Sequence, residues 1–288
     1  MTHRSRSPRV ARARQVLLAF TAFALSTSAA IPTRAGETIP EADVPPELKV
    51  FDNPKPLLPI PDAQDIQLSE SEWAAVQRGE IVVQIVEYSK EDRMARGIGY
   101  MKNHPVSIFD VATDSVIAVQ NFPEITGVCI MRAEPRGKIF YMTVKPAFLL
   151  PTYEFTSIAE YADPPTGQTF HQIKGDFQRN EGVHAYLWDP ERKETLGVFQ
   201  FAFGLKGILS ILPESLLLNL AKRSLPDAIR KMDAIATRIQ QEEPARAQKV
   251  NETWAALKPR LESGELPGRI WHGPPAAAVA SAGHDAAP

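Results

Sequence analysis

Six segments with the alternating pattern of β-strands follow one another between residues 127 and 203. They span residues 127–132, 138–144, 152–161, 169–177, 181–188 and 195–203. Turn-forming residues interrupt the series, as in PPTG at 164–167 and DPERK at 189–193, because proline, glycine and aspartate favour tight changes of direction. Strands joined by such short breaks pair with their sequence neighbours, so the series predicts an antiparallel meander.

Two further strands and two helices are expected around this meander. The strands span residues 81–88 and 93–102, and a helix begins at Pro105, since proline suits the first helical position. The longest helical pattern runs from Pro213 to about Gln241, with apolar residues three or four apart from Leu225 onward. Pro226 within it predicts a kink or a division into two helices. The expected fold is α+β, a curved antiparallel sheet closed by a long C-terminal helix around a single core.

The region from Gly79 to Gln241 resembles the START-like superfamily, also called SRPBCC, whose architecture is known as the helix-grip fold. The order of the elements supports this resemblance, and so do two stretches of sequence. Residues 175–177 (GDF) and 181–186 (EGVHAY) are similar to the central hairpin of these domains. Residues 207–216, followed by Asn219, Leu225 and Pro226, are similar to the loop and start of their last helix.

The resemblance implies a curved sheet wrapped around the terminal helix, with a deep apolar cavity between them. In this superfamily such a cavity holds a lipid, a sterol, a polyketide or a similar molecule. Many members carry a tryptophan two residues after the hairpin glycine, where this sequence has His184. The resemblance covers about 160 residues and leaves both flanks unexplained.

Aromatic residues gather on the strands that would face this cavity. Alternate residues of a strand share a face, and three short runs at this spacing, together with the terminal helix, supply the candidate ligand-binding residues. They are Tyr153, Phe155, His184, Tyr186, Trp188, Phe199, Phe201, Phe203, Leu217 and Leu220. The alternative is that these side chains only fill a packed core. A cavity of roughly 300 Å³ or more would favour the ligand-binding interpretation.

Catalytic and metal-binding patterns are sparse, so no catalytic residue, metal ligand or cofactor is predicted. His104, His171 and His184 show no i, i+4 pairing of the kind that binds zinc on a helix. Cys129 stands between Val128 and Ile130 in a strand and is expected to be buried and inert. Neither GxSxG, nor a phosphate-binding glycine loop, nor HExxH occurs in the sequence.

Charge and cysteine content exclude several classes of protein. The 288 residues include 32 Lys and Arg against 34 Asp and Glu, without the excess of positive charge that nucleic acid binding requires. Nucleic acid is therefore not an expected partner. One cysteine forms no intramolecular disulfide, so the fold depends on its core.

Residues 1–30 have the layout of a secretory signal peptide. Five arginines precede the apolar run from Val16 to Leu25, and small residues follow up to Ala30. The apolar run is shorter than the roughly 20 residues of a spanning helix, which argues against the alternative of an uncleaved anchor. The expected location is the periplasm or the exterior, and the mature chain would carry a net charge of about −7.

The flanks have a different composition from the central region. Residues 31–78 form a proline-rich leader with one short helix from Ser69 to Arg78, where Ser69 and Glu72 have the spacing of a capping box. Residues 242–288 form a C-terminal extension with a short helix around Trp254 to Leu261, limited by Pro259. The Ala-, Pro- and Gly-rich sequence after residue 266 is expected to be mostly disordered.

Three functions remain open at the level of the sequence. The first is an exported binding or transfer protein for a hydrophobic small molecule, with transient contact to a membrane left open and no protein partner identified. The second is an enzyme of the polyketide cyclase or aromatase type, with His184 as acid or base. The third is an interaction scaffold without a ligand. A cavity separates the first two from the third, and turnover of a bound molecule separates the first from the second.

Overall fold

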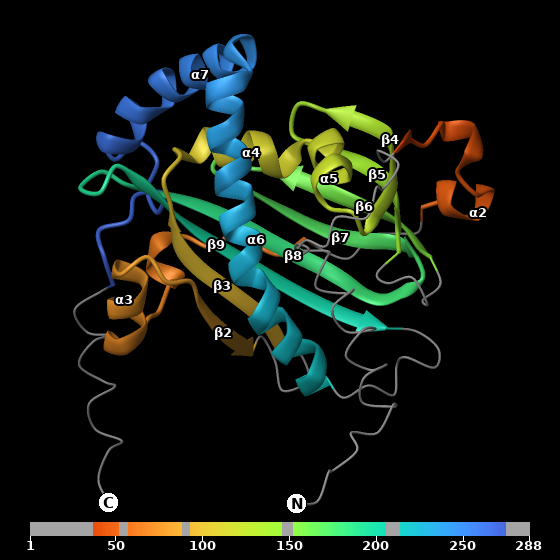
Figure 1. Cartoon of the computed structure of the whole chain (residues 1–288), viewed down its shortest axis with the longest axis horizontal. Coiled ribbons are helices and arrows are strands. Elements are labelled where there is room, and N and C mark those ends of the chain that lie inside the picture. Colours follow the sequence, from red (N-terminus) through yellow and green to blue (C-terminus); the bar gives the residue numbers. More distant parts are fainter. Residues whose placement is uncertain (1–36, 52–56, 88–92, 146–151, 206–213, 275–288) are drawn as a thin grey trace, which may run out of the picture.

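The computed structural model describes residues 37–51, 57–87, 93–145, 152–205 and 214–274. The segment expected to be a signal peptide therefore lies outside the described residues. Within these ranges, nine strands form one sheet in the order β1-β4-β5-β6-β7-β8-β9-β3-β2 (Figure 1). They are β1 (Glu37–Thr38), β2 (Val82–Glu87), β3 (Arg93–Met101), β4 (Ile125–Glu134), β5 (Gly137–Val144), β6 (Tyr153–Tyr161), β7 (Gly167–Gly175), β8 (Phe177–Asp189) and β9 (Glu194–Leu205).

The strands β4 to β9 pair in sequence order, as the alternating segments predict. Every pair in the sheet is antiparallel except β1 with β4, which is parallel. β9 returns to pair with β3, with Phe199 opposite Gly97 and Phe201 opposite Ala95. The two predicted early strands therefore complete the sheet beyond the meander.

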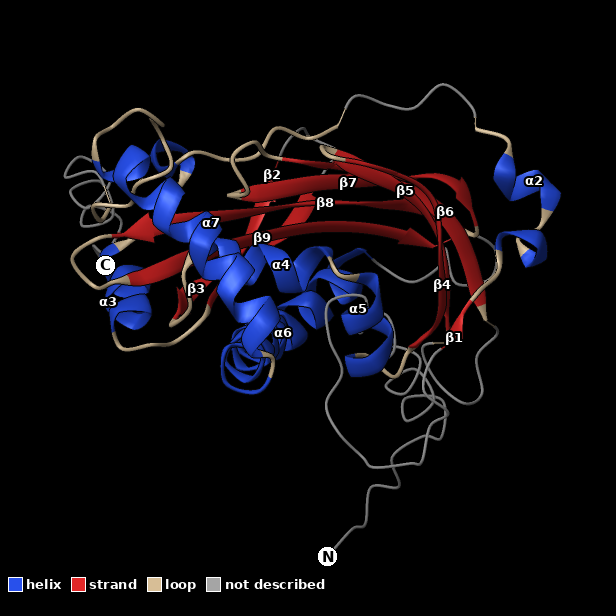
Figure 2. Cartoon of the chain, turned by 90° about the horizontal axis from the view of Figure 1, so that it is seen from above, coloured by secondary structure: helices blue, strands red, loops and turns tan. Residues whose placement is uncertain are grey.

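Among the described residues, three helices cover the concave side of the sheet. These are α4 (Pro105–Thr113), α5 (Ser115–Asn121) and α6 (Glu214–Glu242), with α7 (Pro244–Glu262) following at one end. In Figure 2 the strands form a curved layer, and α4, α5 and α6 lie together on one side of it. The main core lies between this face and the helices, and it includes Phe199, Tyr186, Ile229 and Ile235. The predicted α+β helix-grip fold is confirmed.

The long terminal helix differs from the prediction in one respect. α6 runs without division for 29 residues, although Pro226 stands inside it. Proline removes the amide that would bond to the carbonyl of residue 222, and Lys222 is exposed, so water can reach that carbonyl. Beyond it, Leu225, Ile229 and Met232 are buried against the sheet. Packing along the whole face keeps the helix continuous.

The second face of the sheet is covered by the two flanks of the chain. Helix α3 (Glu70–Gln77) begins at Ser69, whose hydroxyl and backbone amide both bond with Glu72, so the predicted capping box is present. Val76 of this helix and Trp271 of the C-terminal segment are fully buried against Val198 and other outward side chains of β3, β8 and β9. This smaller cluster adds to the main core.

Expected disorder after residue 266 does not hold for residues 267–274. The backbone of Trp188 pairs there with Arg269 and Trp271, and the Trp271 side chain is 1% exposed, packed on Trp73. Residues 267–274 contain few apolar side chains. One tryptophan buried against an apolar surface is nevertheless enough to order such a short segment.

The last helix is also longer than expected. Pro244 occupies the first helical position of α7, and the helix continues through Pro259 to Glu262. Val250, Leu257 and Leu261 bury one side of it against Val106 and Trp188. Helix α5 was not expected from the sequence; Asp114 begins it by accepting hydrogen bonds from the amides of Val116 and Ile117.

Helices long and apolar enough to span a bilayer are not found in the described part of the chain.

Candidate functional site

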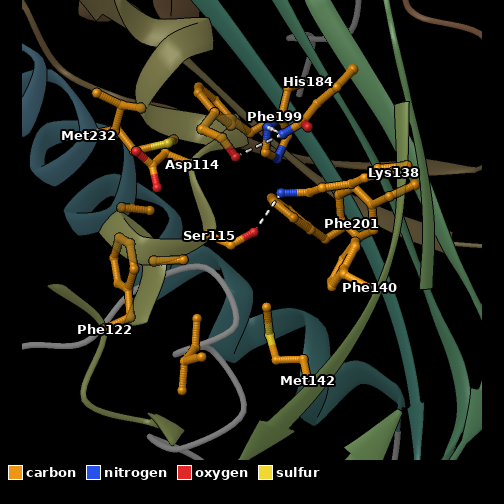
Figure 3. Close-up of a pocket in the computed structure, with 18 of the residues that line it drawn as sticks. Asp114, Ser115, Phe122, Lys138, Phe140, Met142, His184, Phe199, Phe201 and Met232 are labelled. Atoms are coloured by element: carbon orange, nitrogen blue, oxygen red, sulfur yellow. Dashed lines mark hydrogen bonds between the residues drawn. The ribbon is translucent and has the colours of Figure 1, made fainter. Parts of the chain in front are cut away.

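A cavity of about 140 Å³ lies between the sheet and helices α4, α5 and α6 (Figure 3). Its wall is mostly apolar, and a few polar side chains contribute to it. The lining residues are Val111, Ala112, Asp114, Ser115, Ala118, Phe122, Ile125, Lys138, Phe140, Met142, Ala159, Gln168, Phe170, His184, Phe199, Phe201, Leu225, Ala228 and Met232. A cavity of similar size in another protein holds benzene, so this one has room for a single ring or a short alkyl chain. It is smaller than the roughly 300 Å³ expected above for a ligand pocket.

Strand periodicity places the sheet side of this lining. Phe140 and Met142 alternate along β5, and Phe199 and Phe201 alternate along β9. Residues opposite each other on neighbouring strands point to the same face, so His184, opposite Phe199, also faces the helices. On the helix side, Leu225, Ala228 and Met232 of α6 follow the three- and four-residue spacing of one helical face.

His184 is the central polar residue of the cavity. Its Nδ1 atom lies 3.0 Å from Gln168 Nε2 and 3.1 Å from the hydroxyl of Tyr186. Its Nε2 atom is buried and has no hydrogen-bond partner among the described residues. Burial lowers the pKa of His184 to about 3, because the apolar surroundings disfavour the imidazolium. The imidazole is therefore neutral over the physiological range.

The proton on this imidazole can be assigned from its neighbours. Gln168 Nε2 also lies 3.4 Å from the carbonyl oxygen of Ala112, which only accepts hydrogen bonds, so this end of the amide is the NH₂ group. The same group donates to His184 Nδ1, which makes Nδ1 the acceptor of the neutral ring. Nε2 then carries the proton. The cavity wall thus presents an N–H donor with no acceptor among the described residues.

Lys138 supplies the second polar group. Its Nζ atom donates to the carbonyl oxygen of Thr113 and to Ser115 Oγ, both at 2.7 Å, and Figure 3 shows the bond to Ser115. Burial of the amine lowers the pKa of Lys138 to about 8, although nearby Asp114 opposes this shift. At neutral pH most of the amine is still protonated.

Asp114 is held by groups outside the cavity. Its carboxylate caps α5 and forms an ion pair with Arg246 of α7 at 2.8 Å. Arg246 also binds Asp110 of α4 at 2.7 Å. These bonds link α7 to the α4–α5 corner and keep the carboxylate of Asp114 engaged.

The predicted ligand-binding residues fall into three groups. His184, Phe199 and Phe201 line the cavity, and Tyr186 lies directly behind His184. Tyr153 and Phe155 instead pack on Phe177 in the main core. Trp188 packs on Trp254 of α7, away from the cavity. The side chains of Phe203, Leu217 and Leu220 lie outside the described part of the structure, although their backbones belong to β9 and α6.

Sequence reasoning missed the polar lining residues. Lys138 occupies an inward position of β5, whose next inward residues, Phe140 and Met142, are apolar, and Gln168 alternates with Phe170 on β7. A polar residue in line with the alternate apolar residues of a strand could have indicated a polar group in the cavity wall. Asp114 and Ser115 belong to the unexpected corner before α5, and no strand pattern could reveal them.

The other titratable residues singled out above have structural surroundings. His104 caps α4 and stacks on Trp254, with ring centroids 4.9 Å apart. Cys129 is buried on β4 beside Tyr141, and burial raises the pKa of its thiol. Within the described ranges, no group of three or more His, Cys, Asp or Glu side chains is arranged to hold a metal ion.

No family model and no curated protein matches this sequence. Solved structures that match include human STARD10, with 13% identity over 67% of this chain and 88% of that one and a TM-score of 0.47. A STAR-related lipid transfer protein from Xanthomonas axonopodis has 15% identity over 55% and 92%, with a TM-score of 0.42. The Zhui aromatase/cyclase from Streptomyces sp. R1128 has 13% identity over 59% and 95%, with a TM-score of 0.35. Identities this low transfer no ligand or activity to this chain.

Proposed function

We propose that the protein binds a hydrophobic small molecule in the cavity between the sheet and α6. The observation that carries this proposal is the unpaired N–H of His184, a residue of the mostly apolar cavity wall. A buried donor without an acceptor costs about 1–3 kcal/mol, and a bound molecule with an oxygen acceptor would recover that cost.

Cavity size supports a modest ligand. About 140 Å³ accommodates one ring or a short chain. A complete lipid, sterol or polyketide would require the helices to move away from the sheet. Our proposal includes binding or transfer of a lipid, sterol or polyketide-like molecule, and uptake of such a molecule would require the cavity to open.

The chemistry of His184 favours binding over the cyclase or aromatase alternative. A general acid or base works best with a pKa near the working pH, whereas the pKa of His184 is about 3. Nδ1 is occupied by Gln168 and Tyr186, and Nε2 already carries a proton. The ring is therefore suited to hold an oxygen of a ligand by donating a hydrogen bond.

Native mass spectrometry tests the proposal directly. Protein purified from its own exported fraction should carry an additional mass that organic extraction removes and identifies. Ala159→Leu, which fills the cavity from β6, should abolish both this mass and the binding of a fluorescent fatty acid or sterol probe. Ala256→Leu on the exposed side of α7 is the matched control and should bind like wild type. Equal probe binding by wild type and Ala159→Leu would place the ligand elsewhere and contradict the proposal.

We also propose that the protein acts after export, in the periplasm or outside the cell. The arginines and apolar run of residues 1–30 support this proposal. N-terminal sequencing of the exported form should find a start between about Ala29 and Glu37. Retention of Val16 in a carbonate-resistant membrane fraction would contradict it. Ligand delivery through transient membrane contact belongs to the same proposal, and the fraction that carries the ligand would reveal it.

A further inference from the structure

The amine of Lys138 is an unusual component of an apolar cavity wall. Most of its neighbours in the lining are aliphatic or aromatic, and its own strand continues with Phe140 and Met142. The two oxygens that Nζ contacts, from Thr113 and Ser115, are neutral. An ammonium group has three donors, so one N–H remains for a further acceptor.

No carboxylate compensates this charge directly. Among the described residues, none lies within ion-pair distance of Lys138 Nζ. Asp114 is the nearest acidic lining residue, and its carboxylate is bound by Arg246 and by the first amides of α5. Asp110, the other acid at this corner, is bound by Arg246 as well. Charges removed from water are normally paired, and a carboxylate bound at Nζ would give Lys138 the direct ion pair that Asp110 and Asp114 do not form with it.

His184 adds a second donor to the same cavity. Its Nε2–H has no acceptor among the described residues, and its side chain is 8% exposed. In Figure 3, Lys138 reaches in from β5 and His184 from β8, and both are directed to the same end of the cavity, beside Ser115. This end therefore offers two donors, one of them charged, next to an aromatic wall formed by Phe199 and Phe201.

We propose that the ligand is an amphipathic carboxylic acid, whose carboxylate binds Lys138 Nζ and whose oxygen atoms accept the Nε2–H of His184, while its apolar part occupies the aromatic end of the cavity. This inference rests on the proposed function and specifies its ligand class. One positive charge matches a carboxylate, whereas a doubly charged phosphate would need further donors that this wall does not provide. A neutral alcohol or hydrocarbon would form no ion pair with the ammonium.

Isothermal titration of the full chain with octanoate and 1-octanol at pH 7 tests the inference. The two molecules share a chain length that suits a small cavity, and they differ in charge. A charge-assisted hydrogen bond to Lys138 should make octanoate bind about 10- to 100-fold more tightly than 1-octanol. Equal affinities would overturn the carboxylate inference and leave the proposed function standing. Absence of binding by either molecule would overturn both.

Variants then assign the effect to the residue. Lys138→Met keeps the side chain unbranched, shortens it by one atom and removes its charge, so it should erase the preference for octanoate over 1-octanol. Lys138→Arg keeps the charge and should restore most of the preference. Lys249→Met, on an exposed position of α7, is the control for loss of a positive charge. A denaturation midpoint for each variant identifies any that fail to fold. In that case the comparison of octanoate with 1-octanol on wild type still decides the matter. Unchanged preference in folded Lys138→Met would contradict the inference.

Discussion

Lys138 and His184 are both titratable side chains of the cavity wall, and burial lowers the pKa of each. Their effects on stability differ in pH range. His184 is neutral in the folded protein well below its ordinary pKa of 6.5, so it disfavours folding as the pH falls from 6.5 toward 3. Lys138 acts at alkaline pH, where few other described groups of the cavity titrate.

The Lys138 amine predicts a measurable rise in stability with pH. Its pKa is about 8 when folded and 10.5 ordinarily, so between these values the unfolded chain binds more protons. The free energy of unfolding of wild type should therefore rise from pH 8 to 10.5 relative to Lys138→Met. We expect about 2 kcal/mol, since solvent reaches part of the side chain. Urea denaturation of both proteins across this range measures it, and parallel curves would refute it.

Phe201 separates a cavity wall from a packed core. Phe155, fully buried against Phe177, should cost about 3–5 kcal/mol when replaced by alanine. Phe201 contacts Phe170 on one side and borders the cavity on another. Replacing it by alanine should therefore cost less, about 2 kcal/mol of unfolding free energy. Phe201→Ala should also change the affinity for a fluorescent fatty acid probe, because it enlarges the cavity. Phe201→Leu controls for shape, and equal losses at positions 155 and 201 in denaturant would mean that Phe201 is ordinary core.

Helix α6 approaches the sheet most closely over β3, where Gly97 faces it. A Cβ atom built on Gly97 would lie 3.1 Å from Ile229 Cδ1 and 3.3 Å from Leu225 Cβ. At the present spacing of helix and sheet, a side chain larger than that of glycine at position 97 would press against α6. The cavity floor lies just beyond, where Leu225 and Ala228 of the same helix join the lining.

Larger residues at position 97 should push α6 away from the sheet. Gly97→Ala requires the helix to give way by a few tenths of an ångström, and Gly97→Val by more. We expect the free energy of unfolding to fall more for valine than for alanine, by about 1–3 kcal/mol for valine. The same order should appear in the affinity for octanoate if α6 sets the cavity width. Denaturant midpoints and titrations on the two variants measure both, and a stabilised Gly97→Val would show that the helix is not in tight contact.

The molecule as a whole uses both faces of one sheet for different purposes. The concave face forms the main core and the cavity, whereas the opposite face of β3, β8 and β9 is covered by the leader and the C-terminal segment. Trp73 of α3 and Trp271 of the C-terminal segment meet there, with ring centroids 5.9 Å apart. Residues almost two hundred positions apart thus close one apolar surface.

Removal of Trp271 should separate stability from binding. Trp271→Ala deletes a side chain that is 1% exposed and should cost about 3–5 kcal/mol of unfolding free energy. The cavity lies on the other face, so the affinity of the folded variant for octanoate should stay within about twofold of wild type, as expected for distant sites. A thermal or urea melt and one titration suffice. A large loss of affinity in the folded variant would show that the flanks reach the cavity.

Local sequence patterns predicted most of the elements, because strand periodicity, turn residues and caps act over a few residues. The six meander segments, the start of α4 at Pro105 and the capping box of Ser69 are all present. The same patterns predicted that Phe199 and Phe201 share one face of their strand, and the register of β8 with β9 places His184 on that face. These features depend on neighbours in the chain, and the chain alone specifies them.

Long-range packing settled the remaining features, which no local pattern contains. Pro226 does not interrupt α6 and Pro259 does not interrupt α7, because each helix packs a buried face against the rest of the protein. Trp271 is ordered by a surface made of β8, β9 and α3. Trp188 shares a strand face with His184, yet α7 covers it, so only one of the two reaches the cavity. The donor on His184 Nε2 likewise depends on Gln168 and Ala112, which the fold brings to it from other elements.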